Sequence, residues 1–111
     1  MKKESINYLL DIMLYLLIIA SYFAVNANQM IQHEEAHKAI NLQNGCKDST
    51  ITYSFLYLDG ETKCHEAKPN PQRDYLHSIN EIEGYNNQAI INSIFIATLL
   101  IIMTLRWNKT K

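Results

Sequence analysis

The sequence predicts a mainly α-helical membrane protein with two long antiparallel transmembrane helices that extend outside the bilayer, and a small disulfide-tied β-hairpin between them. Three observations support this fold class. Residues 6–25 and 89–105 are apolar runs, each about as long as a helix needs to cross a lipid bilayer. Segment 26–88 between them is polar and holds both cysteines. In a chain of 111 residues, too little sequence remains to cover both runs as buried core helices of a soluble domain.

Charge predicts the orientation in the membrane. The two tails outside the apolar runs carry five basic residues against a single Glu4, whereas segment 26–88 is acidic on balance. Positive residues are retained on the cytoplasmic side, so both termini are expected in the cytoplasm and the central segment outside the cell membrane. Asp11, inside the first run, lies close enough to its cytosolic end for the carboxylate to reach the interface.

A cleaved signal peptide is an alternative to the first span. Met1-Lys2-Lys3 resembles the basic start of a signal peptide, and Val25-Asn26-Ala27 resembles the small-residue pattern before a cleavage site. Cleavage after Ala27 would leave one span attached to the same external segment.

Residues 26–43 are predicted to continue the first span outward as one long helix. Their apolar residues recur at broadly helical spacing, and no Pro or Gly occurs between Ser5 and Gly45. Asn44-Gly45 is typical of a helix C-terminus, because glycine readily adopts the left-handed conformation found there.

A β-hairpin is predicted next. Residues 49–58 are rich in β-branched and aromatic side chains, Asp59-Gly60 is a turn signal, and residues 61–64 form a short return strand. Cys46 and Cys64 bracket the hairpin, so we expect a disulfide bond that ties its open end; two buried free thiols are the alternative.

The rest of the chain is predicted to be a connector and a second long helix. Residues 65–72 contain both prolines, and Pro71 suits the first turn of a helix. Between residues 73 and 107 only Gly84 weakens the helical pattern, so one helix should run through the second span. Trp107 marks its cytosolic interface.

Residues 33–37, His33-Glu34-Glu35-Ala36-His37, have the form H-E-x-x-H. On a helix, positions i and i+4 project from one face, so both imidazoles can bind the same Zn²⁺. Glu34 then lies beside the open coordination position, where a metal-bound water needs a base. The competing interpretation is a solvated helix face that carries two histidines by coincidence.

Helix geometry indicates where a third ligand can come from. His33 follows Val25 by eight residues and Glu81 precedes Ala89 by eight residues, so each lies about 12 Å beyond its span at the standard helical rise. Two antiparallel helices that leave the same membrane face would bring the two side chains to one level.

The second helix offers several site candidates. Glu81 is the preferred third ligand, with His77 and Glu83 as alternatives. His77 shares a helix face with Glu81 and could instead orient it or stabilise an oxyanion. Tyr85 is a further, weaker oxyanion candidate.

A long helix with H-E-x-x-H, a β-hairpin and a second helix with Asn80-Glu81 resemble the gluzincin metallopeptidases. The membrane setting is similar to that of integral membrane zincins, including the site-2 protease group. This resemblance implies zinc ligands at His33, His37 and Glu81, with Glu34 as the general base. The sequence lacks the Asp that commonly follows the second gluzincin motif, and it lacks the Asn-Pro-Asp-Gly of site-2 proteases.

The sequence therefore predicts a single-domain protein, residues 1–111, that is a small membrane zincin: a zinc-dependent hydrolase acting on a protein or peptide. A substrate strand could add to the hairpin edge. Two alternatives stay open: a non-enzymatic small subunit of a larger membrane complex, with a structural metal site or none, or a simple anchor whose histidines are incidental. The sequence contains no Gly-rich phosphate loop, no Ser/His/Asp order and no basic surface for nucleic acid.

Overall fold

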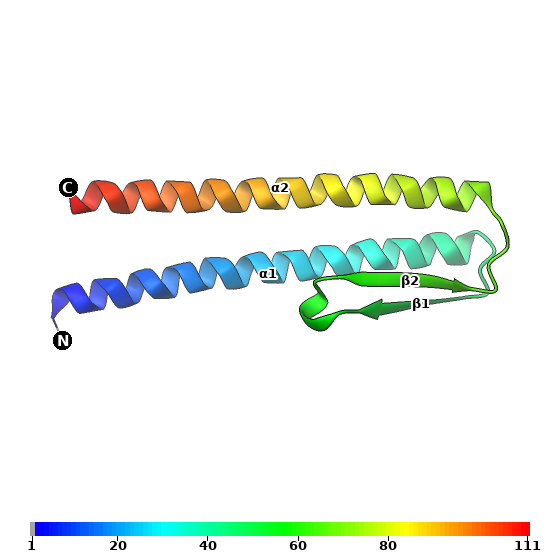
Figure 1. The fold of residues 1–111 in the computed structure, drawn as a ribbon, viewed down its shortest axis with the longest axis horizontal. Coiled ribbons are helices and arrows are strands. Elements are labelled where there is room, and N and C mark those ends of the chain that lie inside the picture. Colours follow the sequence, from blue (N-terminus) through cyan, green and yellow to red (C-terminus); the bar gives the residue numbers. More distant parts are fainter. Residues whose placement is uncertain (1) are drawn as a thin grey trace.

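Two long helices and a β-hairpin make up the fold, which a computed structural model describes for residues 2–111 (Figure 1). Helix α1 spans Lys3–Gln43 and helix α2 spans Pro71–Thr110. Between them lie strand β1 (Asp48–Tyr53), the 3-10 turn η1 (Phe55–Tyr57) and strand β2 (Gly60–His65). The helices run antiparallel, so both termini lie at one end of an elongated molecule that measures 67 × 24 × 14 Å.

The predicted order of elements is confirmed. The structure has two long apolar helices, an antiparallel two-stranded hairpin between them, and a disulfide bond between Cys46 and Cys64. Each helix is long and apolar enough to cross a membrane, and within residues 2–111 the most apolar stretch of each is entirely unburied. The hairpin packs against the C-terminal half of α1 (Figure 1).

Local sequence signals set the helix ends as expected. The backbone of Gly45 has a φ of 86°, which a residue with a side chain rarely adopts, and the Asn44 amide caps the last turn of α1. At the start of α2, the Asn70 side-chain oxygen accepts a hydrogen bond from the Arg73 amide at 3.1 Å, and Pro71 occupies the first turn.

The predicted first strand, residues 49–58, is too long. Strand β1 ends at Tyr53, which pairs with Gly60 as the last pair of the ladder. Because β2 begins at Gly60, residues 54–58 have no partner strand in the hairpin, and they form an exposed loop that contains the turn η1. Ser54 and Asp59 close this loop through a backbone hydrogen bond of 2.9 Å. β-Propensity depends on a neighbouring strand, and none lies beside these residues in the two-stranded sheet.

A polar seam joins α1 to α2. Hydrogen bonds cross it from Tyr22 to Asn92 at 2.6 Å, from Gln88 to Asn26 at 2.6 Å, from Gln29 to the Gly84 carbonyl at 3.4 Å, and from Asn80 to the His33 carbonyl at 3.2 Å. Successive contacts lie three or four residues later in α1 and four residues earlier in α2. This constant register brings His33 and Glu81 to one level, as the helical rise predicts.

Candidate metal centre

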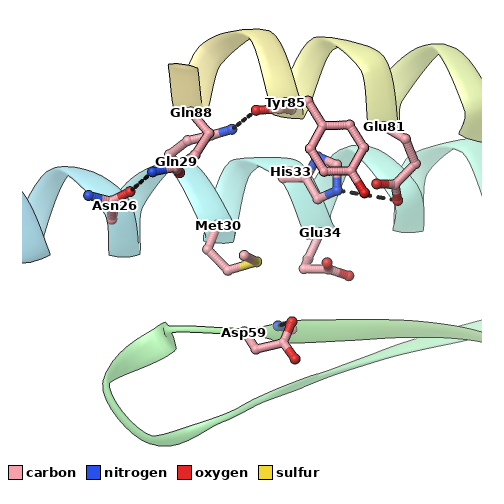
Figure 2. A pocket seen from close by; sticks show the side chains of 11 residues that line it. Asn26, Gln29, Met30, His33, Glu34, Asp59, Glu81, Tyr85 and Gln88 are labelled. Carbon is pink, nitrogen blue, oxygen red and sulfur yellow. Dashed lines mark hydrogen bonds and ion pairs between the residues drawn. The ribbon is translucent and has the colours of Figure 1, made fainter. Parts of the chain in front are cut away.

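Three donor atoms from the two helices converge in the half of the seam that lies beside the hairpin. His33 Nε2 lies 3.1 Å from His37 Nε2, and Glu81 Oε1 lies 2.9 Å from His37 Nε2 and 3.5 Å from His33 Nε2. Figure 2 shows the His33 and Glu81 side chains directed toward each other. Ligands about 2.0–2.1 Å from a tetrahedral Zn²⁺ are about 3.3 Å apart. The three donors therefore have the spacing of three corners of a tetrahedral site.

The chemistry of this group fits a cation. Imidazole nitrogens and a carboxylate oxygen are the ligands that Zn²⁺ takes in catalytic sites. Three atoms that carry lone pairs repel one another at such short distances unless a proton or a metal ion lies between them. The two imidazoles are largely shielded, with 13% and 10% of the His33 and His37 side chains exposed, whereas the Glu81 side chain is 49% exposed. The group could hold a metal ion that remains open to solvent on the Glu81 side.

The structure separates the alternatives for the third donor. His77 lies behind His37, with its Nδ1 at 2.6 Å from His37 Nδ1, so it contacts the ring edge opposite the convergent atoms. Glu83 is exposed and lines a different cavity, on the other side of His33. Of the three candidates, Glu81 is the one whose oxygen approaches both histidines.

Burial favours the neutral form of His77. Desolvation lowers the pKa of its imidazole, and the nearby His37 and Arg73 lower it further. A neutral imidazole can accept a hydrogen bond at one nitrogen while it donates from the other. His77 is thus suited to act as a hydrogen-bond partner of His37.

Glu34 is held by the hairpin. Its side chain is 5% exposed and points from α1 toward the hairpin (Figure 2). The Thr62 hydroxyl on β2 donates to Glu34 Oε2 at 2.5 Å. A Cβ atom at Gly60 would lie 2.7 Å from Glu34 Cγ, so a glycine is needed where β2 passes this side chain.

A second glycine, Gly84, leaves room for the His33 imidazole. A Cβ atom at Gly84 would lie 2.7 Å from His33 Nδ1, so any larger residue would push the imidazole aside. Glycine in a helix interior is unfavourable by about 1 kcal/mol relative to alanine. In α2 this close approach of the imidazole to the backbone explains why the position is a glycine.

A cavity of about 300 Å³ opens beside the donor group, between the helices and the start of β2 (Figure 2). His33, Glu34 and Glu81 all line it, and Glu34 and Glu81 also line a second cavity on the far side. Tyr85 lines the first cavity and is 73% exposed, so its hydroxyl is accessible to a molecule bound there. The arrangement presents a buried carboxylate and a potential metal site to the same space.

Tyr53 is the last residue of β1 and lies, with Glu34, next to Gly60. Burial raises the pKa of its phenol, and the carboxylates of Glu35 and Glu34 raise it further. Its ring lies 5.0 Å from that of Tyr57, between ring centres. The phenol therefore stays protonated at neutral pH and adds no charge next to Glu34.

Sequence reasoning missed several residues that support the site. Asn41 follows His37 by four residues, so helical spacing alone could have identified it as a neighbour on the same face. Thr62 could not be found in this way, because its contact with Glu34 depends on how the hairpin docks on α1.

We found no protein-family model, no characterised protein and no solved structure that matches this chain.

Proposed function

We propose that the protein is a small membrane-bound zinc hydrolase of the metallopeptidase type. His33, His37 and Glu81 would be the zinc ligands, and Glu34 the general base. The observation that carries this proposal is the convergence of two imidazole nitrogens and a carboxylate oxygen within 3.5 Å of one another, beside a buried carboxylate that lines the same cavity.

In this proposal, the zinc ion, Glu34 and Tyr85 would each have one role in the hydrolysis. Bound zinc would polarise a substrate carbonyl and lower the pKa of a water ligand to about 7. Thr62 occupies Oε2 of Glu34, so we assign proton transfer to Oε1. Hydrolysis adds the hydroxyl of water to the carbonyl carbon, the C–N bond breaks, and the proton taken by Glu34 passes to the leaving nitrogen. Tyr85 is the candidate for a hydrogen bond to the developing oxyanion.

We also propose that both helices cross the cell membrane, over residues 6–25 and 89–105, with cytoplasmic termini and segment 26–88 outside. The apolar side chains of these stretches are exposed, and water would solvate them poorly. An ion pair between Asp11 and Arg106 joins the two helices near the basic tails. The proposed site then lies about 12 Å above the bilayer core, where a flexible peptide segment at the membrane surface could enter the cavity.

Metal analysis and one substitution test the proposal. The full-length chain, purified in mild detergent, should contain one zinc ion, and His37→Ala should lose it. Glu34→Gln should keep the zinc while hydrolysis of a peptide library falls by about a hundredfold or more, because the proton acceptor is gone.

Glu35→Gln is the matched control, since Glu35 is the neighbouring carboxylate but is exposed. It should change neither zinc content nor activity. A wild-type chain without bound metal would overturn the proposal. A wild-type chain that binds zinc but hydrolyses no peptide, so that Glu34→Gln changes nothing, would assign the site a structural role in a larger complex.

A further inference from the structure

The geometry points to a hydrogen-bond relay, made by His77, Asn41 and Ser49, that positions His37. We infer that this relay holds the proton of His37 on Nδ1 and leaves Nε2 free to bind metal. The metal-binding part of the inference rests on the proposed function, whereas the proton positions can be tested without it.

The relay is continuous from the ligand group to the hairpin. His37 Nδ1 lies 2.6 Å from His77 Nδ1, and His77 Nε2 lies 2.8 Å from Asn41 Oδ1. The Asn41 amide nitrogen then donates to Ser49 Oγ on β1 at 3.0 Å. Helix α1 supplies His37 and Asn41, whereas His77 comes from α2 and Ser49 from β1.

The chemistry of the amide gives the relay a direction. Asn41 Nδ2 donates to Ser49, so Oδ1 faces His77, and a carbonyl oxygen can only accept. With the amide in this orientation, His77 Nε2 carries the proton, which leaves Nδ1 bare in the neutral ring. His37 Nδ1 must then donate to it, and His37 Nε2 presents its lone pair toward His33 and Glu81.

The opposite arrangement of protons would prevent His37 Nε2 from binding a metal ion. A proton on His77 Nδ1 would make His37 Nδ1 the acceptor and place the His37 proton on Nε2. That proton would occupy the space between His37 and Glu81 in which a metal ion would bind. Ligating histidines usually donate their second ring N–H to a carboxylate, carbonyl or water; here a neutral imidazole takes that part.

Burial strengthens the relay. Asn41 is 3% exposed, Ser49 is 4% exposed and His37 is 8% exposed, whereas His77 is half-buried, so water competes least for the bond between Asn41 and Ser49. Removing one member leaves a buried polar group without its partner, which is more costly than the gain from the bond itself.

The disulfide bond secures the outer end of the relay. Ser49 pairs with Cys64 in the ladder, and the amide of Cys46 donates to the Asn41 carbonyl oxygen at 3.0 Å. Both half-cystines thus sit next to a relay member. The hairpin consequently supports the ligand group through Asn41 and also holds Glu34 through Thr62.

Zinc affinity tests the positioning role. His77→Phe keeps a ring of similar size but removes both nitrogens, and Asn41→Leu removes the acceptor. Each should weaken zinc binding by about 10- to 100-fold in competition with a chromophoric chelator, because partners of this kind have effects of that size. His77→Asn places an oxygen near the former Nδ1 position and should recover most of the affinity. Ser78→Ala, an exposed neighbour, is the control.

Nitrogen chemical shifts of the histidine rings test the proton positions directly. In the wild-type chain at a pH of about 8, where free imidazoles are neutral, His77 should carry its proton on Nε2 and His37 should carry one on Nδ1. Asn41→Leu should abolish the preference at His77 while circular dichroism shows intact helices.

Wild-type His77 protonated on Nδ1 would overturn the relay, as would zinc affinities of His77→Phe and Asn41→Leu within twofold of wild type. A wild-type chain that binds no zinc would remove the proposed function, and the ring shifts would then still decide whether the relay exists.

Discussion

Two glycines allow the close contacts on which the candidate site depends. Gly84 in α2 leaves room for the His33 imidazole, and Gly60 at the start of β2 leaves room for the Glu34 side chain. At both positions a single methyl group would come within 2.7 Å of the site residue. Packing at this density leaves little space for added volume. The positions of the two side chains therefore depend on the absence of a Cβ atom at the two glycines.

Gly84→Ala separates site geometry from helix stability. Alanine should favour the helix by about 1 kcal/mol, yet its methyl group should displace His33 and weaken zinc binding by tenfold or more. Chelator competition measures the affinity, and circular dichroism measures the helix. Asn86→Ala, an exposed substitution two residues along α2, should bind zinc like wild type. Equal affinities in the two variants would show that His33 is not held by this contact.

Thr62→Val tests how Glu34 is held. The substitution preserves the shape of the side chain but removes the hydroxyl that donates to the buried carboxylate. A buried acceptor left without its partner costs about 1–3 kcal/mol, so the unfolding temperature should drop. We expect peptide hydrolysis to fall by about tenfold while zinc stays bound.

Thr52→Val on the exposed face of β1 provides the comparison, since its hydroxyl bonds to the Glu61 carbonyl at the longer distance of 3.4 Å. It should leave the activity unchanged. Equal activities of the Thr62 and Thr52 variants would assign the hydroxyl of Thr62 no part in holding the base.

At the scale of elements, the hairpin holds side chains of the candidate site in place, and the disulfide bond closes the open end of the hairpin. The hairpin has only two strands, and isolated two-stranded hairpins are marginally stable in water. It is stabilised by packing on α1 and by the bond between Cys46 and Cys64, which are 18 residues apart. The helices, in contrast, form their backbone hydrogen bonds within one segment, and they extend beyond the hairpin.

Reduction of the disulfide should therefore loosen the hairpin and leave the helices. Closing a loop of this length stabilises a fold by about 3 kcal/mol in the chain-entropy model. The melting temperature of the hairpin region should fall by about 10 °C or more on reduction, as followed by tyrosine fluorescence, with little change in helical circular dichroism. A double Cys46→Ser, Cys64→Ser chain should behave like the reduced protein and not respond to reductant. An unchanged melting temperature would mean that packing on α1 holds the hairpin by itself.

At the scale of the whole molecule, the two ends of the helix pair have different surfaces. The half with the termini contains the apolar stretches 6–25 and 89–105, whereas the opposite half carries the hairpin and the polar residues of the candidate site. The length of 67 Å exceeds the bilayer core of about 30 Å, so a spanning helix pair would project well into water on one side.

Protease protection tests this arrangement. The chain should stay in the membrane fraction after carbonate extraction, and protease added outside intact cells should cut only within residues 26–88. Tags at both termini should remain protected, because the basic tails favour the cytoplasm. An N-terminal tag missing from the mature chain would identify the first apolar run as a cleaved signal peptide. Tags digested from outside would reverse the orientation.

The sequence by itself determined the features that depend on local interactions. Asn44-Gly45 and Asn70-Pro71 mark helix ends because capping and backbone conformation are decided within a few residues. Helical spacing places His33 and His37 on one face. The bracketing cysteines predicted the disulfide bond that the structure contains.

Only the tertiary structure decided which residues meet from different elements. The approach of Glu81 to the two histidines, in preference to His77 or Glu83, follows from the register between α1 and α2, which is set by contacts far apart in the chain. The strand pairing ended β1 at Tyr53 although the residues beyond it favour strands. The support of Glu34 by Thr62 likewise required the hairpin to dock on α1. Such contacts join distant segments, and local preferences carry no information about their partners.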